Sequence, residues 1–165
     1  MAYILDANVF IEAKNRRYGL DFCPAFWEWL IEGNQQGKII SIEKVRDELL
    51  AGADELADWA RQFGPEFYLQ LTTAAITKLQ DVTDWATKQG YEPSAVTAFL
   101  SGADLYLIAE ALGSGHTVVT HEIPAPQSKK RIKIPDACNH FRIKHMTPFL
   151  MLRTEKARFV LDDPA

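Results

Sequence analysis

The chain has 165 residues, of which 47% are hydrophobic and 24% charged, and its formal net charge is −4. This length and composition predict one soluble globular domain and exclude a chain that is mostly disordered. No apolar run reaches the ~20 residues needed to cross a bilayer, and the acidic balance excludes a uniformly basic nucleic-acid-binding surface, so any such contact must come from local basic segments.

The two cysteines, Cys23 and Cys138, have no CxxC spacing and are too few for a disulfide scaffold. The N-terminus lacks the basic stretch, apolar core and small-residue site of a signal peptide. We therefore expect a cytoplasmic protein that does not associate with membranes.

Short apolar strands alternate with helices along the chain, without repeats or linkers, so we expect a single domain over 1–165. The predicted elements, in chain order, are a strand at 2–6, helices at 8–15 and 21–37, a strand at 38–42, a helix at 43–64 with a break near 51–52, further helix at 66–80 and 81–89, a turn or helix at 92–100, a helix at 102–115, and strands at 116–122 and 142–146. The tail after about residue 156 is expected to be loose. This alternation predicts an α/β fold with a mainly parallel sheet covered on both faces.

Four acidic residues stand at strand ends or on the helices that follow strands. They are Asp6 at the end of the first strand, Glu48 in "SIEKVRDELLAG", Asp104 at the start of "GADLYLIAEAL", and Glu122 at the end of "TVVTHE". In a parallel sheet these positions share one edge, where ligands bind at a topological switch point. The four carboxylates are therefore expected to converge.

Each acid also has a plainer interpretation. Asp6 could cap helix 8–15, and Glu48 could be a solvated helical acid. Asp104 could be a first-turn acid favoured by the helix dipole, although its helix is so apolar that a buried aspartate there needs a partner. Glu122 could be a loop residue that merely follows the strand.

Taken together, converging carboxylates repel one another unless a positive charge lies among them. Mg²⁺ prefers oxygen ligands and keeps several waters, so two direct carboxylates would suffice, with the others acting through water. The absence of a His/Cys ligand set and of a nucleophile motif favours metal-assisted phosphodiester hydrolysis, in which a metal-activated water attacks in line.

The segments "YILDANVFI", "SIEKVRDELLAG" and "GADLYLIAEALGSGHTVVTHE" resemble, in order and spacing, the successive motifs of PIN-domain ribonucleases, over residues 3 to about 147. The resemblance implies a three-layer α/β/α sandwich and Mg²⁺- or Mn²⁺-dependent endoribonuclease activity on RNA. Many bacterial members are VapC-type toxins, which are homodimers neutralised by a small antitoxin protein.

Carried over by position, Asp6 and Asp104 match the two central metal-binding aspartates of that family. Glu48 matches its helical glutamate, and Glu122 matches a fourth acid that is often Asp. Asn8 and Thr120 match polar positions that could orient Asp6 or a bound water, although Asn8 could equally be a helix cap and Thr120 a half-buried strand residue.

The chain is longer than compact toxin members between residues 52 and 102 and again after Glu122. This longer form resembles a PIN subfamily usually left without an assigned function. In the second insertion, Asp136 of "KIPDACNHF" could join the metal site, or "IPD" could begin a helix.

Two basic segments lie near the predicted edge and could contact RNA phosphates. One is "SKKRIK" at 128–133, with Lys129, Lys130 and Arg131, and the other is the pair Arg16 and Arg17. Either could instead be a solvated run of charge.

Other functions compete with the ribonuclease. A PIN-like fold could serve as a non-catalytic RNA- or protein-binding module, and the same metal chemistry could act on DNA. A dehalogenase-like phosphatase also begins with a strand-end Asp, but needs a second acid at the position that Asn8 occupies. No glycine-rich phosphate loop follows the first strand, so nucleotide-cofactor folds are disfavoured.

Overall fold

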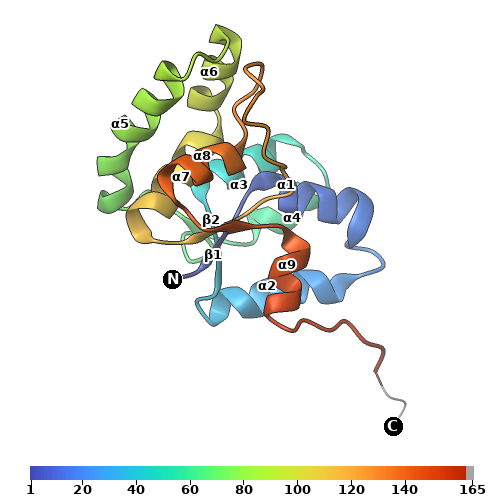
Figure 1. Ribbon diagram of the computed structural model, residues 1–165. Coiled ribbons are helices and arrows are strands. Elements are labelled where there is room, and N and C mark those ends of the chain that lie inside the picture. Colours follow the sequence, from blue (N-terminus) through green and yellow to red (C-terminus); the bar gives the residue numbers. More distant parts are fainter. Residues whose placement is uncertain (163–165) are drawn as a thin grey trace.

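A parallel five-stranded sheet forms the centre of the protein in the computed structural model, which describes residues 1–162 (Figure 1). Its strands are β1 (Tyr3–Leu5), β2 (Ile39–Ile42), β3 (Tyr68–Leu69), β4 (Thr117–Val119) and β5 (His145–Met146). They lie in the order β3-β2-β1-β4-β5, and every neighbouring pair is parallel. The chain therefore builds the sheet outward in one direction from β1 to β3 and in the other from β4 to β5, which makes the boundary between β1 and β4 a topological switch point.

Helices cover both faces of this sheet, which gives the three-layer α/β/α sandwich. They are α1 (Ala7–Glu12), continued by the π-helix η1 (Ala13–Arg17), α2 (Pro24–Gln35), α3 (Glu43–Ala51), α4 (Glu55–Arg61), α5 (Thr73–Lys88), α6 (Pro93–Ser101), α7 (Ala103–Ser114), α8 (Ile134–Phe141) and α9 (Pro148–Thr154). In Figure 1, α2 and α9 lie on one side of the labelled strands, and α7 and α8 on the other. The predicted α/β class and parallel sheet are confirmed.

The break near 51–52 is confirmed, because α3 ends at Ala51 and α4 begins at Glu55. The prediction of helix at 66–80 is wrong in its first part. Residues 68 and 69 form β3, which pairs with β2 at Ser41 and Ile42, and Phe67 and Tyr68 are buried. Pairing with a buried strand outweighs local helix propensity in so short a segment. Helix α5 starts only after Thr72, whose hydroxyl accepts from Ala75 N.

The apolar helix predicted at 102–115 is α7, and it lies in the core, with Leu107, Ile108 and Ala109 fully buried. Helix α5 packs against it at close range: a Cβ added to Gly113 would lie 2.6 Å from the Ala74 carbonyl carbon. Only glycine permits two helix backbones to approach so closely. This packing sets the position of α7 and therefore of Asp104 at its first turn.

The C-terminal part contains two helices, of which the sequence had offered α8 only as an alternative and had not indicated α9. The tail is packed further than expected, since the Phe159 ring lies edge-on to Tyr18 and Phe26, with centroid distances of 5.9 and 6.2 Å. Val160 and Leu161 are exposed, as a loose tail requires.

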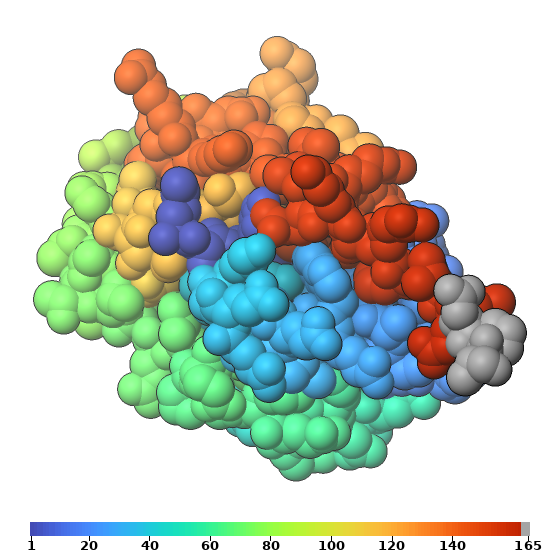
Figure 2. All heavy atoms as spheres, turned by 90° about the horizontal axis from the view of Figure 1, so that it is seen from below, coloured from blue at the N-terminus to red at the C-terminus, as the bar shows by residue number. Residues whose placement is uncertain are grey.

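The amino-terminal edge of the sheet is closed by side chains. Glu155 accepts hydrogen bonds from the Tyr3 hydroxyl at 2.7 Å and from Lys38 Nζ at 3.2 Å. Figure 2 shows the first residues, in dark blue, at the surface between the light-blue segment around β2 and the red C-terminal part. The carboxyl-terminal edge is on the opposite side, and there the loops leave an open cavity.

Among residues 1–162, no single helix is long and apolar enough to cross a membrane; α6 and α7 pass that test only together, across a bend of 66°.

Candidate functional site

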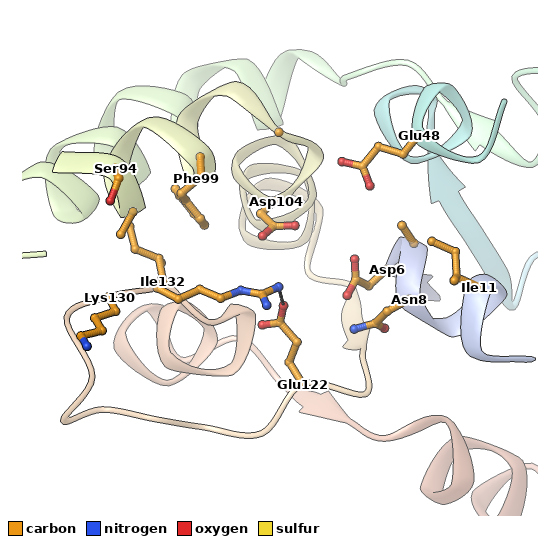
Figure 3. A pocket seen from close by; sticks show the side chains of 15 residues that line it. Asp6, Asn8, Ile11, Glu48, Ser94, Phe99, Asp104, Glu122, Lys130 and Ile132 are labelled. Atoms are coloured by element: carbon orange, nitrogen blue, oxygen red, sulfur yellow. Dashed lines mark hydrogen bonds and ion pairs between the residues drawn. The ribbon is translucent and has the colours of Figure 1, made fainter. Parts of the chain in front are cut away.

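The four predicted acids line one cavity of about 500 Å³ at the carboxyl-terminal edge of the sheet, beside the switch point (Figure 3). Asp6 follows β1, Glu48 lies on α3, Asp104 is in the first turn of α7, and Glu122 follows β4. Figure 3 shows Asp6, Glu48 and Asp104 facing a common space from three elements, with Glu122 below them. Residues up to 116 positions apart in sequence thus meet because parallel strands end at the same edge.

Asp6 belongs to the cavity and does not cap the helix that follows it. Although it occupies the N-cap position of α1, its side chain makes no capping hydrogen bond. Instead, its Oδ2 accepts from the Thr120 hydroxyl at 2.9 Å. The parallel register aligns Leu5 with Val119, and Asp6 N donates to Val119 O, so Asp6 and Thr120 are the next pair beyond the ladder.

Asn8 and Thr120 form a hydrogen-bond network with Asp6. The Thr120 hydroxyl oxygen accepts from Asn8 Nδ2 at 3.3 Å and from Glu122 N at 3.1 Å. Its two acceptor positions are therefore filled, and its single proton is directed to Asp6. Asn8 Oδ1 accepts from His121 N at 3.2 Å, which fixes the orientation of the amide. The alternative of Asn8 as a helix cap is thus wrong, and both residues support the Asp6 carboxylate.

Glu48 and Glu122 are each bound to the start of a helix. Glu48 Oε1 accepts from Ala103 N, the first residue of α7, at 3.2 Å. Glu122 Oε2 accepts from Ile134 N, the first residue of α8, at 2.8 Å, and its Oε1 pairs with Arg131 at 3.0 Å. Both glutamates therefore present carboxylate oxygens at the wall of the cavity.

For the two aspartates, burial and neighbouring negative charges outweigh the groups that lower their pKa values. Burial raises the pKa of Asp6 well above its ordinary value, the charge of Asp104 adds to this, and the Thr120 hydrogen bond opposes it. Burial, and then the charges of Glu122 and Glu48, raise the pKa of Asp104 to about 7. Among residues 1–162, no hydrogen bond to the Asp104 carboxylate contributes to its pKa. Two acids forced toward their neutral forms mark a place where a cation would be bound favourably.

The side chains fit a hard divalent cation by their chemistry, since they offer carboxylate oxygens and no sulfur or imidazole. Over the described residues, no three Asp, Glu, His or Cys side chains close around one point as a complete metal cage would. Glu48 and Glu122 are held at the helix starts, so Asp6 and Asp104 are the pair available for direct contact. This pattern suits Mg²⁺ or Mn²⁺, which keep several waters as ligands.

Asp136 does not line the cavity. Both of its carboxylate oxygens accept from Ala125 N at 3.1 Å, and it lies in the first turn of α8. Its expected place in the metal site is therefore not supported, and the alternative that "IPD" begins a helix is confirmed. Its role is to fasten the loop after Glu122 to α8.

The predicted basic residues separate into two groups. Lys130 and Arg131 line the cavity. Lys129 is turned away, because its ammonium donates to Gln89 O and lies 4.9 Å from the centre of the Tyr91 ring. Arg16 is 4.0 Å from Glu12, and Arg17 lies over the Phe149 ring at 5.3 Å. Neither of these two arginines lines the cavity.

One wall of the cavity was not indicated by the sequence. Helix α6 contributes Ser94, Ala98 and Phe99, and the basic loop contributes Ile132. The extra length between residues 52 and 102 was the only signal, and the small and apolar character of these residues carries no chemistry that would have marked them.

Comparison with known proteins gives a family without a functional description. Residues 3–159 match the family described as "Domain of unknown function (DUF4411)". No curated protein matches the chain.

Proposed function

The chain belongs to the DUF4411 family, and we propose that it is a metal-dependent endoribonuclease that hydrolyses RNA phosphodiester bonds. The observation that carries this proposal is the set of four carboxylates, delivered by two strand ends and two helices, around one open cavity with Lys130 and Arg131 at its wall. The resemblance of the sequence motifs to PIN-domain ribonucleases is the second support.

Asp6 and Asp104 would hold Mg²⁺ or Mn²⁺ directly, since they are the two acids of the cavity whose pKa values burial and neighbouring charges raise. Bound there, the cation would supply an activated water and offset charge on the phosphate. Thr120 and Asn8 keep the Asp6 carboxylate in one orientation, which favours ligand binding without a rotamer cost. Glu48 and Glu122 would accept hydrogen bonds from the waters of such a cation, because both carboxylates line the same cavity.

Lys130 and Arg131 would bind the phosphate of the substrate, because the four carboxylates would otherwise repel it. RNA is proposed over DNA on the motif resemblance, since carboxylates and phosphate contacts do not distinguish the sugars. The same resemblance suggests a toxin of the cytoplasm, paired with a small antitoxin and acting as a homodimer. A reducing compartment suits Cys23 and Cys138, which are both free.

The proposal is tested by incubating the purified chain with single-stranded RNA and with DNA of the same sequence, in Mn²⁺, Mg²⁺ or EDTA. We expect metal-dependent cleavage of RNA that is lost in Asp6→Asn and Asp104→Asn. Asp47→Asn is the matched control, because Asp47 is an exposed acid on α3 that does not line the cavity. Cleavage that survives both aspartate substitutions would refute the site. Binding of RNA without cleavage would favour the non-catalytic module, and preferential cutting of DNA would favour the DNA-directed nuclease.

A further inference from the structure

The ion pair between Arg131 and Glu122 lies on the border between two cavities. Besides the cavity of the four acids, a second one of about 600 Å³ is lined by residues that include His121, Ile123 and Lys133. Asn8, Glu122 and Arg131 line both. The pair is therefore part of a common wall, and the dashed line at Glu122 in Figure 3 marks it.

We infer that Arg131 is a phosphate-binding residue that exchanges Glu122 for a phosphate of a single-stranded polynucleotide lying across both cavities. The inference rests on the proposed function, because it assigns a polynucleotide to the same site. Beyond the proposed function, the inference specifies where the polynucleotide lies outside the cavity of the four acids, and that Arg131 changes its partner from Glu122 to a phosphate.

The geometry allows Arg131 to leave Glu122 at little cost. The Arg131 side chain is 64% exposed, whereas that of Glu122 is 8% exposed. Water screens the charge of so exposed a guanidinium, which weakens its pairing with Glu122. Glu122 keeps the hydrogen bond from Ile134 N when Arg131 departs. The exchange thus leaves no buried carboxylate without a donor.

The charges on either side of the pair favour a chain of phosphates. Lys130 lines the first cavity and Lys133 the second, so three positive side chains follow one another along the two cavities. A guanidinium can bind a phosphate through two parallel N–H donors, whereas Arg131 contacts Glu122 through Nη2 alone. The exposed Ile123 in the second cavity offers an apolar surface to a base. A polynucleotide fits these features better than a single small phosphodiester.

Arg131 also places a positive charge at the wall of the cavity of the four acids, 3.0 Å from Glu122 Oε1. A positive charge at this place repels an incoming cation and attracts a phosphate. Removing it should therefore have opposite effects on the two ligands, which loss of structure could not produce.

The experiment measures two affinities of Arg131→Gln without any cleavage. Mn²⁺ binding to the nucleic-acid-free protein, measured by titration calorimetry, should become about two- to fivefold tighter. Binding of a fluorescein-labelled single-stranded oligoribonucleotide in EDTA should become weaker. Over a series of KCl concentrations, the slope of log K against log[salt] should shrink by about 0.7, the value for one lost phosphate contact.

Two variants of the same loop complete the design. Lys133→Gln should weaken oligonucleotide binding and reduce the slope, with no change in Mn²⁺ affinity. Lys129→Gln removes the same charge from a side chain that is turned toward Gln89 and Tyr91, and should leave Mn²⁺ affinity unchanged. Circular dichroism of each variant checks that the fold is kept.

The exchange is overturned if Arg131→Gln weakens Mn²⁺ binding, if the salt slope does not change, or if the unsubstituted protein binds neither ligand. If Lys133→Gln binds the oligonucleotide as tightly as the unsubstituted protein, the polynucleotide does not extend into the second cavity. These binding measurements are independent of the cleavage assay. If Arg131→Gln binds Mn²⁺ more tightly and the oligonucleotide more weakly, but the unsubstituted protein cuts no RNA, the ribonuclease proposal alone is refuted. If the protein cleaves RNA but Arg131→Gln changes neither affinity, the exchange of Glu122 for phosphate at Arg131 alone is refuted.

Discussion

The Thr120 hydroxyl donates a hydrogen bond of 2.9 Å to Asp6 Oδ2, one step beyond the last paired residues of β1 and β4. Because Asn8 and the Glu122 amide fill both acceptor positions of this hydroxyl, its proton has one destination. The end of the strand ladder thus sets both the place and the orientation of the most buried carboxylate at the site.

Replacing Thr120 by valine keeps its shape and removes all three hydrogen bonds. We expect Mn²⁺ affinity and RNA cleavage to fall about 10- to 100-fold, as when the partners of metal ligands are lost. Since the bond lowers the pKa of Asp6, its loss should also move the onset of Mn²⁺ binding to higher pH. Thr120→Ser is the control and should retain the wild-type pH profile. A loss in Thr120→Ser as large as that in Thr120→Val would contradict the role of the hydroxyl, because serine retains it.

The raised pKa values predict how the stability of the metal-free protein depends on pH. Asp104 has a pKa of about 7 when folded, against an ordinary 3.8. Between these values the folded state binds the proton more tightly than the unfolded state, so stability is highest at the acid end and falls as the pH rises toward 7. The shift of Asp6 acts in the same direction. Thermal unfolding in EDTA from pH 5 to 8, a range estimated to cover most of this titration, should show the decline.

Asp104→Asn should flatten that decline and unfold at a higher temperature than the wild type at pH 8 in EDTA. Added Mn²⁺ should stabilise the wild type at pH 8 and leave this variant unchanged, because a ligand stabilises only a protein that binds it. Asp47→Asn should keep the wild-type profile. A steeper decline in Asp104→Asn would contradict the assignment of the raised pKa to this residue.

Features of the site that follow from regular pairing of parallel strands could be predicted from the sequence. Parallel strands end at one edge whatever their lengths, so Asp6, Glu48, Asp104 and Glu122 could be placed together from strand order alone. The register that pairs Asp6 with Thr120 follows from the same ladder.

Contacts made by loops could not be placed in this way. Glu122 is held by Ile134 N, and Asp136 by Ala125 N, through a segment without periodicity. Strand β3 is too short to show alternation, and only its pairing with β2 makes it a strand. The sequence therefore proposed Asp136 for the site on its charge, whereas the fold uses it to anchor a loop.

The buried Glu110 joins α7 to the start of α5, away from the candidate site. It is fully buried, and its carboxylate accepts from Thr72 N at 3.0 Å, from the Thr72 hydroxyl and from the Ser114 hydroxyl at 2.7 Å. Glu110→Leu would remove the acceptor of these hydrogen bonds, although the exposed Thr72 and the half-buried Ser114 can still reach water. We expect a loss of about 1–2 kcal/mol in urea unfolding, with cleavage per folded molecule unchanged. Glu43→Gln is the control, because Glu43 is exposed, and this variant should unfold at the same urea concentration as the wild type. If Glu110→Leu does not change the free energy of unfolding, water replaces the carboxylate as the acceptor of these hydrogen bonds.

The packing of Phe159 predicts that the C-terminal segment contributes to stability. Its ring meets Tyr18 and Phe26, and Phe26 is itself buried in the core against Trp27. Phe159→Ala should lower the free energy of unfolding by about 1–3 kcal/mol, less than for a fully buried phenylalanine because this ring is only partly buried. Leu161→Ala is the matched control, since Leu161 is 95% exposed and should leave the urea midpoint unchanged. Both variants should cleave RNA at the wild-type rate, because neither residue lines the cavity. If Phe159→Ala and Leu161→Ala unfold alike, the segment after residue 156 is loose, as the sequence alone suggested.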